Sequence, residues 1–171
     1  MSIANFKRIV KNSHPAIKVN NNGGNSVKVS VGRNASYVTV QPNANRPGHL
    51  NISAIATDSN HERKGLAGYI TALVVRAAKN AGFKSAGGLS IHMIFNKNNE
   101  NRASRSIWPL SSYIFSRLGF RKLLVQGRPG ISNPTNANRH RIAWNINLGN
   151  NIPKVNEKLR GVHRLNNFIG N

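Results

Sequence analysis

The stretch of this sequence with the clearest chemical potential is "RKGLAG", residues 63–68. It joins a predicted strand to a predicted helix, so it brings unpaired backbone N–H groups and the positive end of the helix dipole to one point. Glycine removes the side chain that would block a ligand there. We therefore predict a phosphate-binding turn made of Arg63, Lys64, Gly65, Leu66, Ala67 and Gly68. The spacing matches neither a Walker A loop nor a three-glycine dinucleotide fingerprint, and a tight strand-to-helix turn alone would also need the glycine.

Few side chains near this turn could transfer a proton. The catalytic candidates are Tyr113 in a later helix, and Asp58 and His61 just before the turn. A general acid or base contributes about 10² to 10⁴ in rate, so a poor supply of such groups argues against strong catalysis. The chain has no cysteine, and its six histidines never pair at a metal-ligand spacing. We expect no metal site.

Hydrophobic periodicity predicts the elements that must position the turn. A short helix begins after Ser2 and ends before "SHP", and the polar segment 19–26 is expected to be a loop. Alternating residues over 26–41 predict an antiparallel hairpin, and residues 50–57 predict a third strand. The turn then opens a helix that continues to Ala81, where Gly82 ends it.

The second half repeats this alternation of strands and helices. Residues 89–95 predict a strand, a helix with Pro109 in its first turn follows, and "RKLLVQ" and "HRIAWNINL" predict two closing strands. Residues 149–171 form a basic tail with a broken amphipathic helix, which would cover the sheet edge or dock on a neighbouring chain. We expect three segments: 1–25 with the first helix and an Asn/Gly-rich loop, a domain at 26–148, and the tail. The fold class is α/β (α+β), with a mixed, mostly antiparallel twisted sheet and crossover helices.

The order of strand "LNISAIAT", turn "RKGLAG", helix, strand "LSIHMIF" and helix "IFSRLGF" resembles the GNAT superfamily of acetyl-CoA-dependent N-acetyltransferases. The resemblance covers residues 26–148. It implies that residues 63–68 hold the pyrophosphate of acetyl-CoA and that strands 50–57 and 89–95 splay apart to admit the pantetheine arm. It also implies a tyrosine near the end of the second helix that protonates the leaving thiolate.

The sequence departs from the family pattern at three positions. Glu62 stands where Gln or Arg usually precedes the turn, and its negative charge would oppose a pyrophosphate. Phe115 stands where the tyrosine is expected, and Trp108 where an asparagine is expected. Tyr113 lies two residues earlier, about 200° around a helix, so we expect it to face elsewhere. The pattern predicts a catalytically degenerate member.

Charge is the strongest compositional feature. The chain carries 25 Lys and Arg against 4 acidic residues, a formal net charge of +21. A charge of this size attracts polyanions, so we expect nucleic acid or acidic protein neighbours. The main functional hypothesis is a structural or assembly component of a large nucleic-acid-containing particle, such as a minor capsid protein of a virion. The alternative is an acetyl-CoA-dependent N-acetyltransferase acting on a protein or small-molecule amine.

The sequence gives little support for secretion, for a membrane span or for a free nucleic-acid-binding regulator. The N-terminus lacks the long apolar core of a secretory signal, and no run is long enough to span a membrane. We expect an intracellular protein or one within a particle. A free nucleic-acid-binding regulator is a third hypothesis, but no helix-turn-helix or zinc-finger spacing is present, and the few aromatic residues occupy core-like positions.

Overall fold

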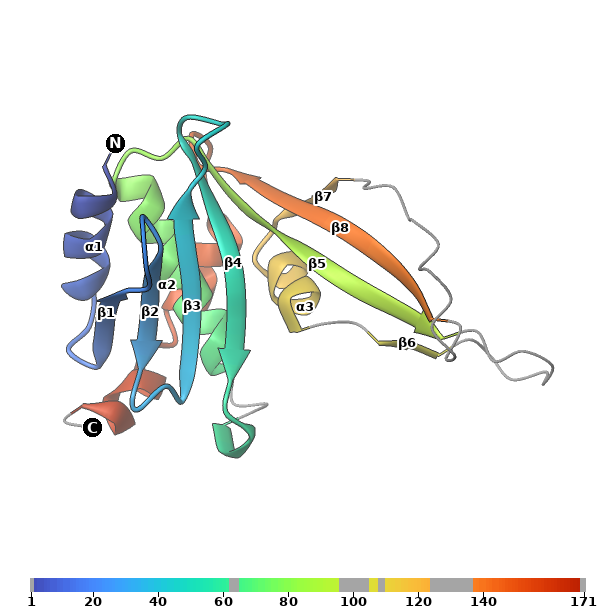
Figure 1. The fold of residues 1–171 in the computed structure, drawn as a ribbon. Helices are drawn as coiled ribbons and strands as arrows, with labels where there is room; N and C mark the ends of the chain where they lie inside the picture. The colour runs from blue at the N-terminus through green and yellow to red at the C-terminus, as the bar shows by residue number, and fades with distance from the viewer. Residues whose placement is uncertain (1, 62–64, 96–104, 108–109, 124–136, 170–171) are drawn as a thin grey trace.

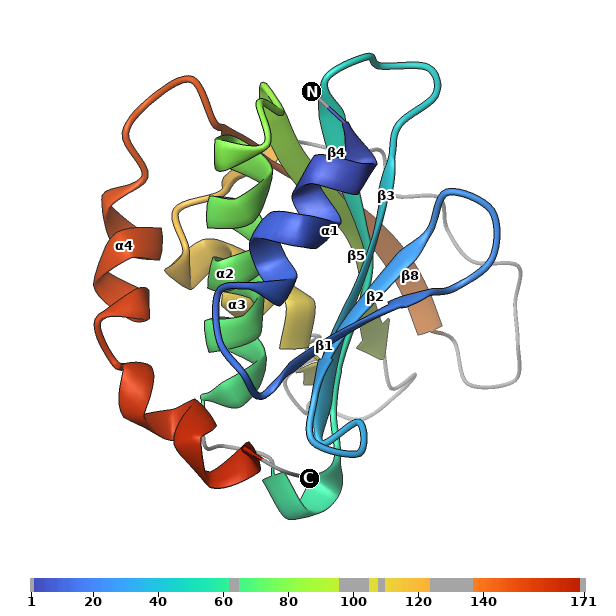
Figure 2. The same ribbon diagram turned by 90° about the vertical axis from the view of Figure 1, so that its left-hand side faces the viewer.

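The computed structural model describes residues 2–61, 65–95, 105–107, 110–123 and 137–169. One twisted sheet forms the body, and the helices lie on one of its faces (Figures 1 and 2). The helical elements are α1 (Ile3–Lys11), η1 (Ser59–His61), α2 (Leu66–Asn80), α3 (Leu110–Arg117), α4 (Pro153–Leu159) and η2 (Val162–Phe168). The strands are β1 (Ile17–Asn21), β2 (Val27–Val31), β3 (Ser36–Pro42), β4 (His49–Thr57), β5 (Ser85–Phe95), β6 (Arg105–Ile107), β7 (Arg121–Leu123) and β8 (Ala137–Asn147).

The sheet has eight strands in the order β1-β2-β3-β4-β5-β8-β7, with β6 paired to β5. Neighbouring strands are antiparallel except for β4 and β5, which are parallel and connected by the crossover helix α2. This pair is joined only from His49–Ser85 to Ile52–Gly88, after which the two strands diverge (Figure 1). The predicted mixed sheet and the predicted splay of these two strands are therefore present.

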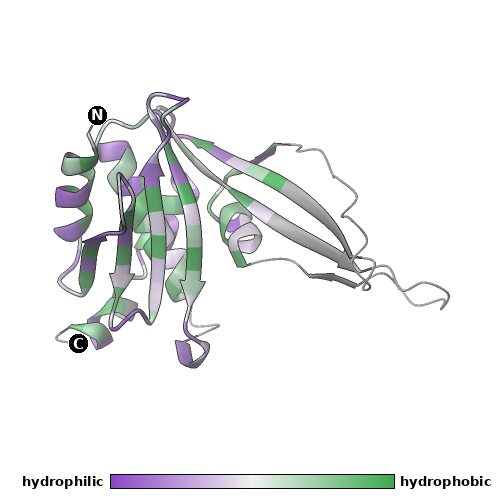
Figure 3. Ribbon diagram, in the orientation of Figure 1, coloured by the Kyte–Doolittle hydropathy of each residue, from purple (hydrophilic) through white to green (hydrophobic). Residues whose placement is uncertain are grey.

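The core lies between the sheet and the helices. Alternate valines of β2 and β3 point toward the helix layer, and α1 adds Phe6 and Val10, which are fully buried. Green apolar bands cross the middle of β2 to β4 in Figure 3, where α2 covers the sheet. Most of α2 is buried, because it packs between the sheet on one side and α4 on the other. This sandwich fixes the position of both ends of α2.

Two predictions for the chain ends were wrong in detail. Residues 19–26 were expected to be a loop, but β1 (Ile17–Asn21) pairs with β2. Edge pairing needs only backbone groups, so an asparagine-rich segment can form a strand. The tail helix was expected on the sheet edge or on a neighbour. Instead α4 packs against α2 and buries Val155 and Leu159 (Figure 2).

The strand after α2 also differs from its prediction. It begins at Ser85 rather than residue 89, because Ala86, Gly87 and Gly88 continue the pairing with β4. Leu89 is 61% exposed, while its neighbour Ser90 is buried. Parts of the predicted closing strand "RKLLVQ", together with Pro109 and Trp108, lie outside the described residues. Within the described residues, no helix is long and apolar enough to cross a membrane.

Candidate functional site

The start of α2 leaves backbone donors open. Gly65 precedes the helix with φ 72°, a left-handed conformation that favours glycine, and no side chain caps the helix. The first helical hydrogen bond runs from the Tyr69 N–H to the Gly65 carbonyl at 3.1 Å. The N–H groups of Leu66, Ala67 and Gly68 therefore have no acceptor within the helix. Of the predicted turn, Arg63 and Lys64, with the preceding Glu62, lie outside the described residues.

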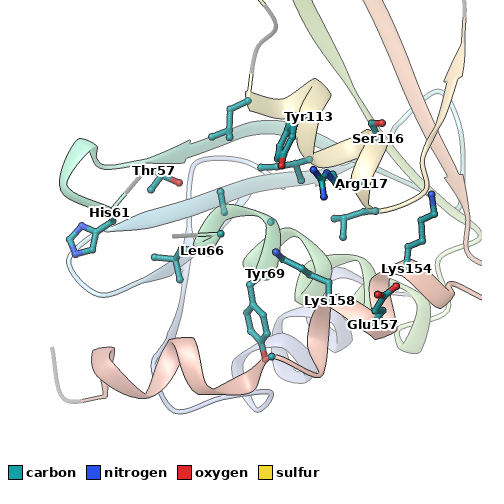
Figure 4. A pocket seen from close by; sticks show the side chains of 17 residues that line it. Thr57, His61, Leu66, Tyr69, Tyr113, Ser116, Arg117, Lys154, Glu157 and Lys158 are labelled. Atoms are coloured by element: carbon teal, nitrogen blue, oxygen red, sulfur yellow. The ribbon is translucent and has the colours of Figure 1, made fainter. Parts of the chain in front are cut away.

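These open donors face a cleft of about 1190 Å³, which we call the helix cleft (Figure 4). It is bounded by the end of β4, the start of α2, α3 and α4. Its lining comprises Thr57, His61, Gly65, Leu66, Ala67, Gly68, Tyr69, Leu110, Tyr113, Ile114, Ser116, Arg117, Leu118, Lys154, Glu157, Lys158 and Gly161. The volume is large enough for a ligand of cofactor size.

Lysine 158 of α4 reaches the open end of α2. A Cβ atom placed on Gly68 would lie 3.3 Å from Lys158 Cε and 3.7 Å from its Nζ, so the absent side chain makes room for the lysine. Both the ammonium and the helix end carry positive charge, which is unfavourable for direct contact. Both positive groups attract an anion. Lys154 and Arg117 add two more cations to the cleft, and Glu157 is the one acidic residue among its described lining residues.

Tyr113 lines the helix cleft. Its side chain is 57% exposed, and the Arg117 guanidinium lies 4.9 Å from its ring centre (Figure 4). Tyr113 and Phe115 face different sides of α3, as the expected rotation of about 200° between them predicts. Phe115 points to the sheet, whereas the other residues from Tyr113 to Arg117 line the cleft.

Phe115 is a core residue at the point where β4 and β5 part. It is 1% exposed, and its ring centre lies 4.7 Å from that of Phe120 and 6.1 Å from that of Trp144. A Cβ on Gly88 would lie 3.0 Å from Phe115 Cζ and 2.4 Å from the Ile52 carbonyl oxygen, so only glycine fits. The phenyl group therefore stabilises the fold, and it has no proton to donate.

The second and third proton-transfer candidates differ in position. His61 lines the cleft across from Tyr113, and its buried Nδ1 has no hydrogen-bond partner among the described residues. Asp58 is exposed and lies outside the lining; its carboxylate accepts a 2.9 Å hydrogen bond from the Asn60 N–H at the start of η1. Only His61 of this pair is placed to meet a ligand. No group of three or more potential metal ligands occurs among the described residues.

Tyr69 is a cleft residue that the sequence did not single out. It is 3% exposed, and burial raises the pKa of its phenol, an effect that the charge of Arg76 partly opposes. The phenol therefore keeps its proton at neutral pH. Lys158 and Arg117 were also missed as cleft residues, because nothing local in the sequence links α3 and α4 to a turn so distant in the chain.

Known proteins resemble this chain in fold and not in sequence. No protein-family model and no curated protein matches the sequence. Solved structures do match. A protein from Desulfovibrio desulfuricans described as a GNAT-family acetyltransferase aligns with TM-score 0.51 and 14% identity, over 72% of this chain and 67% of that one. The spermidine/spermine N-acetyltransferase of Vibrio cholerae aligns with TM-score 0.50 and 11% identity, over 75% and 70%.

A third structure was determined with a ligand. It is a protein from Bacillus anthracis described as a streptothricin acetyltransferase, in complex with acetyl coenzyme A, with TM-score 0.49 and 14% identity, over 74% of this chain and 64% of that one. The strand order, the splay of β4 and β5, and the alignments with TM-scores of 0.50 and 0.51 agree. This chain has the fold of the GNAT acetyltransferase superfamily.

Proposed function

We propose that this chain binds acetyl-CoA in the helix cleft and transfers the acetyl group to an amine. The observation that carries the proposal is the start of α2, where the N–H groups of Leu66, Ala67 and Gly68 have no acceptor within the helix and Lys158 lies close to Gly68, inside a cleft of about 1190 Å³. Such a helix end is suited to phosphate, because donors and dipole both favour negative charge. The GNAT fold supports the same ligand class.

The described residues fit the parts of this substrate. The α2 amides and the Lys158 ammonium suit the pyrophosphate, and the GNAT fold supports an extended arm at the point where the pairing of β4 and β5 ends. Acetyl-CoA supplies an activated thioester, so the protein needs mainly to position it and to handle protons. Tyr113 is the proton donor that we assign to the leaving thiolate, and His61 is the candidate base.

Calorimetric titration with acetyl-CoA tests the binding step. We expect a dissociation constant on the order of 10 µM, about 7 kcal/mol of binding free energy. Acetyl-pantetheine, which has the thioester without the pyrophosphate and nucleotide, is the matched control ligand and should bind at least about tenfold more weakly. Absence of binding at millimolar acetyl-CoA would end the proposal.

Substitution of the proposed proton donor tests the chemical step. Tyr113→Phe should lower kcat by about 10² or more while the affinity for acetyl-CoA stays unchanged, because only the hydroxyl is removed. Release of free thiol from acetyl-CoA, with a panel of lysine peptides and small amines as acceptors, measures it. Tyr37→Phe on the open face of the sheet is the control. An active Tyr113→Phe variant would show that another group, or water, protonates the thiolate.

Net charge favours a second function, which concerns association rather than catalysis. The value of +21 supports binding to a polyanion, whether or not the chain acts on an amine. Neither the fold nor the similar structures favour a role in a virion over the acetyltransferase alternative. We retain polyanion association as a proposal, separate from the catalytic one.

A further inference from the structure

A second hollow lies at the opposite end of α2 from the helix cleft. It has a volume of about 800 Å³ and is lined by the turn before β4, the C-terminal end of α2, the start of β5 and the end of β8. We call it the basic hollow. Its polar side chains include Arg46, Lys79, Lys84, Asn145 and Asn147, and none of its described lining residues carries a carboxylate.

The turn that carries Arg46 is held in place by hydrogen bonds. Asn43 Oδ1 accepts from the Asn45 N–H at 2.9 Å, and the His49 N–H donates to the Arg46 carbonyl at 3.0 Å. The Lys84 N–H then donates to the Gly48 carbonyl at 2.8 Å, which ties the turn to β5. Arg46 and Lys84 are thus presented by a fixed backbone, and less conformational entropy is lost when they bind a ligand.

Strand β8 extends this surface across the sheet. The Arg46 Nη1 donates to Asn145 Oδ1 at 3.5 Å. Asn145 stands opposite Arg121 of β7 in the antiparallel register, so both project from the same face. Arg121 is exposed, which continues the positive surface beyond the hollow.

The charge balance at this end is positive. The C-terminus of α2 carries a partial negative charge, which Lys79 in its last turn offsets; the Lys79 Nζ also donates to the Asn150 carbonyl at 2.8 Å. The described acidic residues, Asp58 and Glu157, lie elsewhere: Asp58 follows the far end of β4, and Glu157 lines the helix cleft. No described carboxylate therefore competes for the cations of the basic hollow.

We propose that the basic hollow and the adjoining Arg121 bind the phosphate backbone of a nucleic acid. The guanidinium, ammonium and amide N–H groups present there are the donors that contact phosphate oxygens, and they carry no base specificity. The surrounding charge of the chain adds the long-range attraction that a densely charged polyanion needs. This inference does not depend on acetyl-CoA binding, because the two sites lie at opposite ends of α2.

Fluorescence anisotropy with the full chain tests the proposal. The probes are a labelled 20-base-pair DNA duplex of random sequence and a single-stranded RNA of the same length, titrated from about 50 to 200 mM KCl. The test variant combines Arg46→Gln, Lys84→Gln and Arg121→Gln. The control variant combines Lys18→Gln, Lys28→Gln and Arg33→Gln on β1, β2 and the turn after β2, so both variants lose the same charge.

The two variants should differ clearly. We expect the test variant to lose at least about tenfold in affinity and two to three units of salt-dependence slope, since each phosphate contact contributes about 0.9. The control variant should lose less than one unit. Equal losses in both variants, or no binding by the unmodified chain, would overturn the assignment. Equally tight binding of poly-glutamate of matched charge would also overturn it, in favour of an acidic protein partner. Thermal unfolding of each variant checks that both remain folded.

Discussion

The two ends of α2 present positive charge in different ways. At the N-terminal end, the anion site that we propose comes from the backbone: amide groups without an acceptor in the helix, the helix dipole and the absent side chain of Gly68, with Lys158 added from α4. At the C-terminal end the dipole has the wrong sign for an anion, and the charge comes from the side chains of Arg46, Lys84 and the adjoining Arg121 on three other segments. The first arrangement suits one buried ligand of fixed shape. The second suits a long charged strand that runs over the surface.

The largest effect should come from placing a negative charge at the N-terminal end. Gly68→Glu puts a carboxylate beside Lys158 and the open amides, where it competes with phosphate, so affinity for acetyl-CoA should fall at least about 100-fold. Stability should not fall, because replacing a helical glycine gains about 0.5 to 1 kcal/mol. Calorimetry and thermal unfolding measure the two effects.

Gly68→Ala is the matched control for that substitution. Its methyl group meets only the flexible end of Lys158, so the lysine can move aside and binding should persist. Nucleic-acid affinity should be the same in both variants if the two ends act separately. If Gly68→Ala also abolished acetyl-CoA binding, the site would require glycine at this position because a larger side chain blocks the ligand, and not because of charge.

The next effect concerns His49, at the base of the turn that presents Arg46. Burial and the nearby Arg46 charge lower the pKa of His49 to about 4, and its Nδ1 lies 2.8 Å from Ser85 Oγ. The unfolded chain binds a proton at this histidine near pH 6.5, whereas the folded chain does not. The free energy of unfolding should therefore fall by about 2 kcal/mol as pH drops from 6.5 to 4.

Urea unfolding between pH 4 and 7 measures this dependence. His49→Asn keeps a polar group near Ser85 and removes the titration, so its stability should change less over the same window. An identical pH dependence in both proteins would mean that other groups cause it. The acid sensitivity would then give no information about the turn beside the basic hollow.

The smallest effect should come from removing one cation at the N-terminal end. Lys158→Gln should weaken acetyl-CoA binding about tenfold, or about 1.4 kcal/mol, because the backbone amides remain. Arg160→Gln, at the C-cap of the same helix, is the control; Arg160 is exposed and lies outside the cleft lining. If both substitutions have equal effects, Lys158 acts only through net charge. Nucleic-acid affinity should change little in either variant.

Much of the fold was predictable because its elements have strong periodicity. The alternating valines of β2 and β3, the apolar stripe of α2 and the strands on either side of it gave the order of elements and the splayed pair. Strand β1 was missed because asparagine and glycine have low strand propensity. Its pairing with β2 depends on backbone hydrogen bonds, which the amino-acid composition does not predict.

The candidate site was only half predictable. The glycine turn could be predicted from the local order of strand, glycines and helix. The residue type of Phe115 alone showed that it cannot donate a proton. The side of α3 that faces the cleft could not be inferred, because a short helix with apolar residues on several faces does not define its own orientation. Lys158 comes from a helix some 90 positions later in the chain, and its approach to Gly68 is a tertiary contact.

Composition and residues close together in the chain were enough to predict the net charge, the glycine turn that opens α2 and the order of most strands and helices, although not strand β1. The tertiary structure alone decided what surrounds the two ends of α2. It placed α4 against α2, so that Lys158 meets the open amides, and it gathered Arg46, Lys84 and Asn145 from three segments at the other end. The physical reason is that such sites arise from packing between elements distant in sequence, which local propensities do not encode.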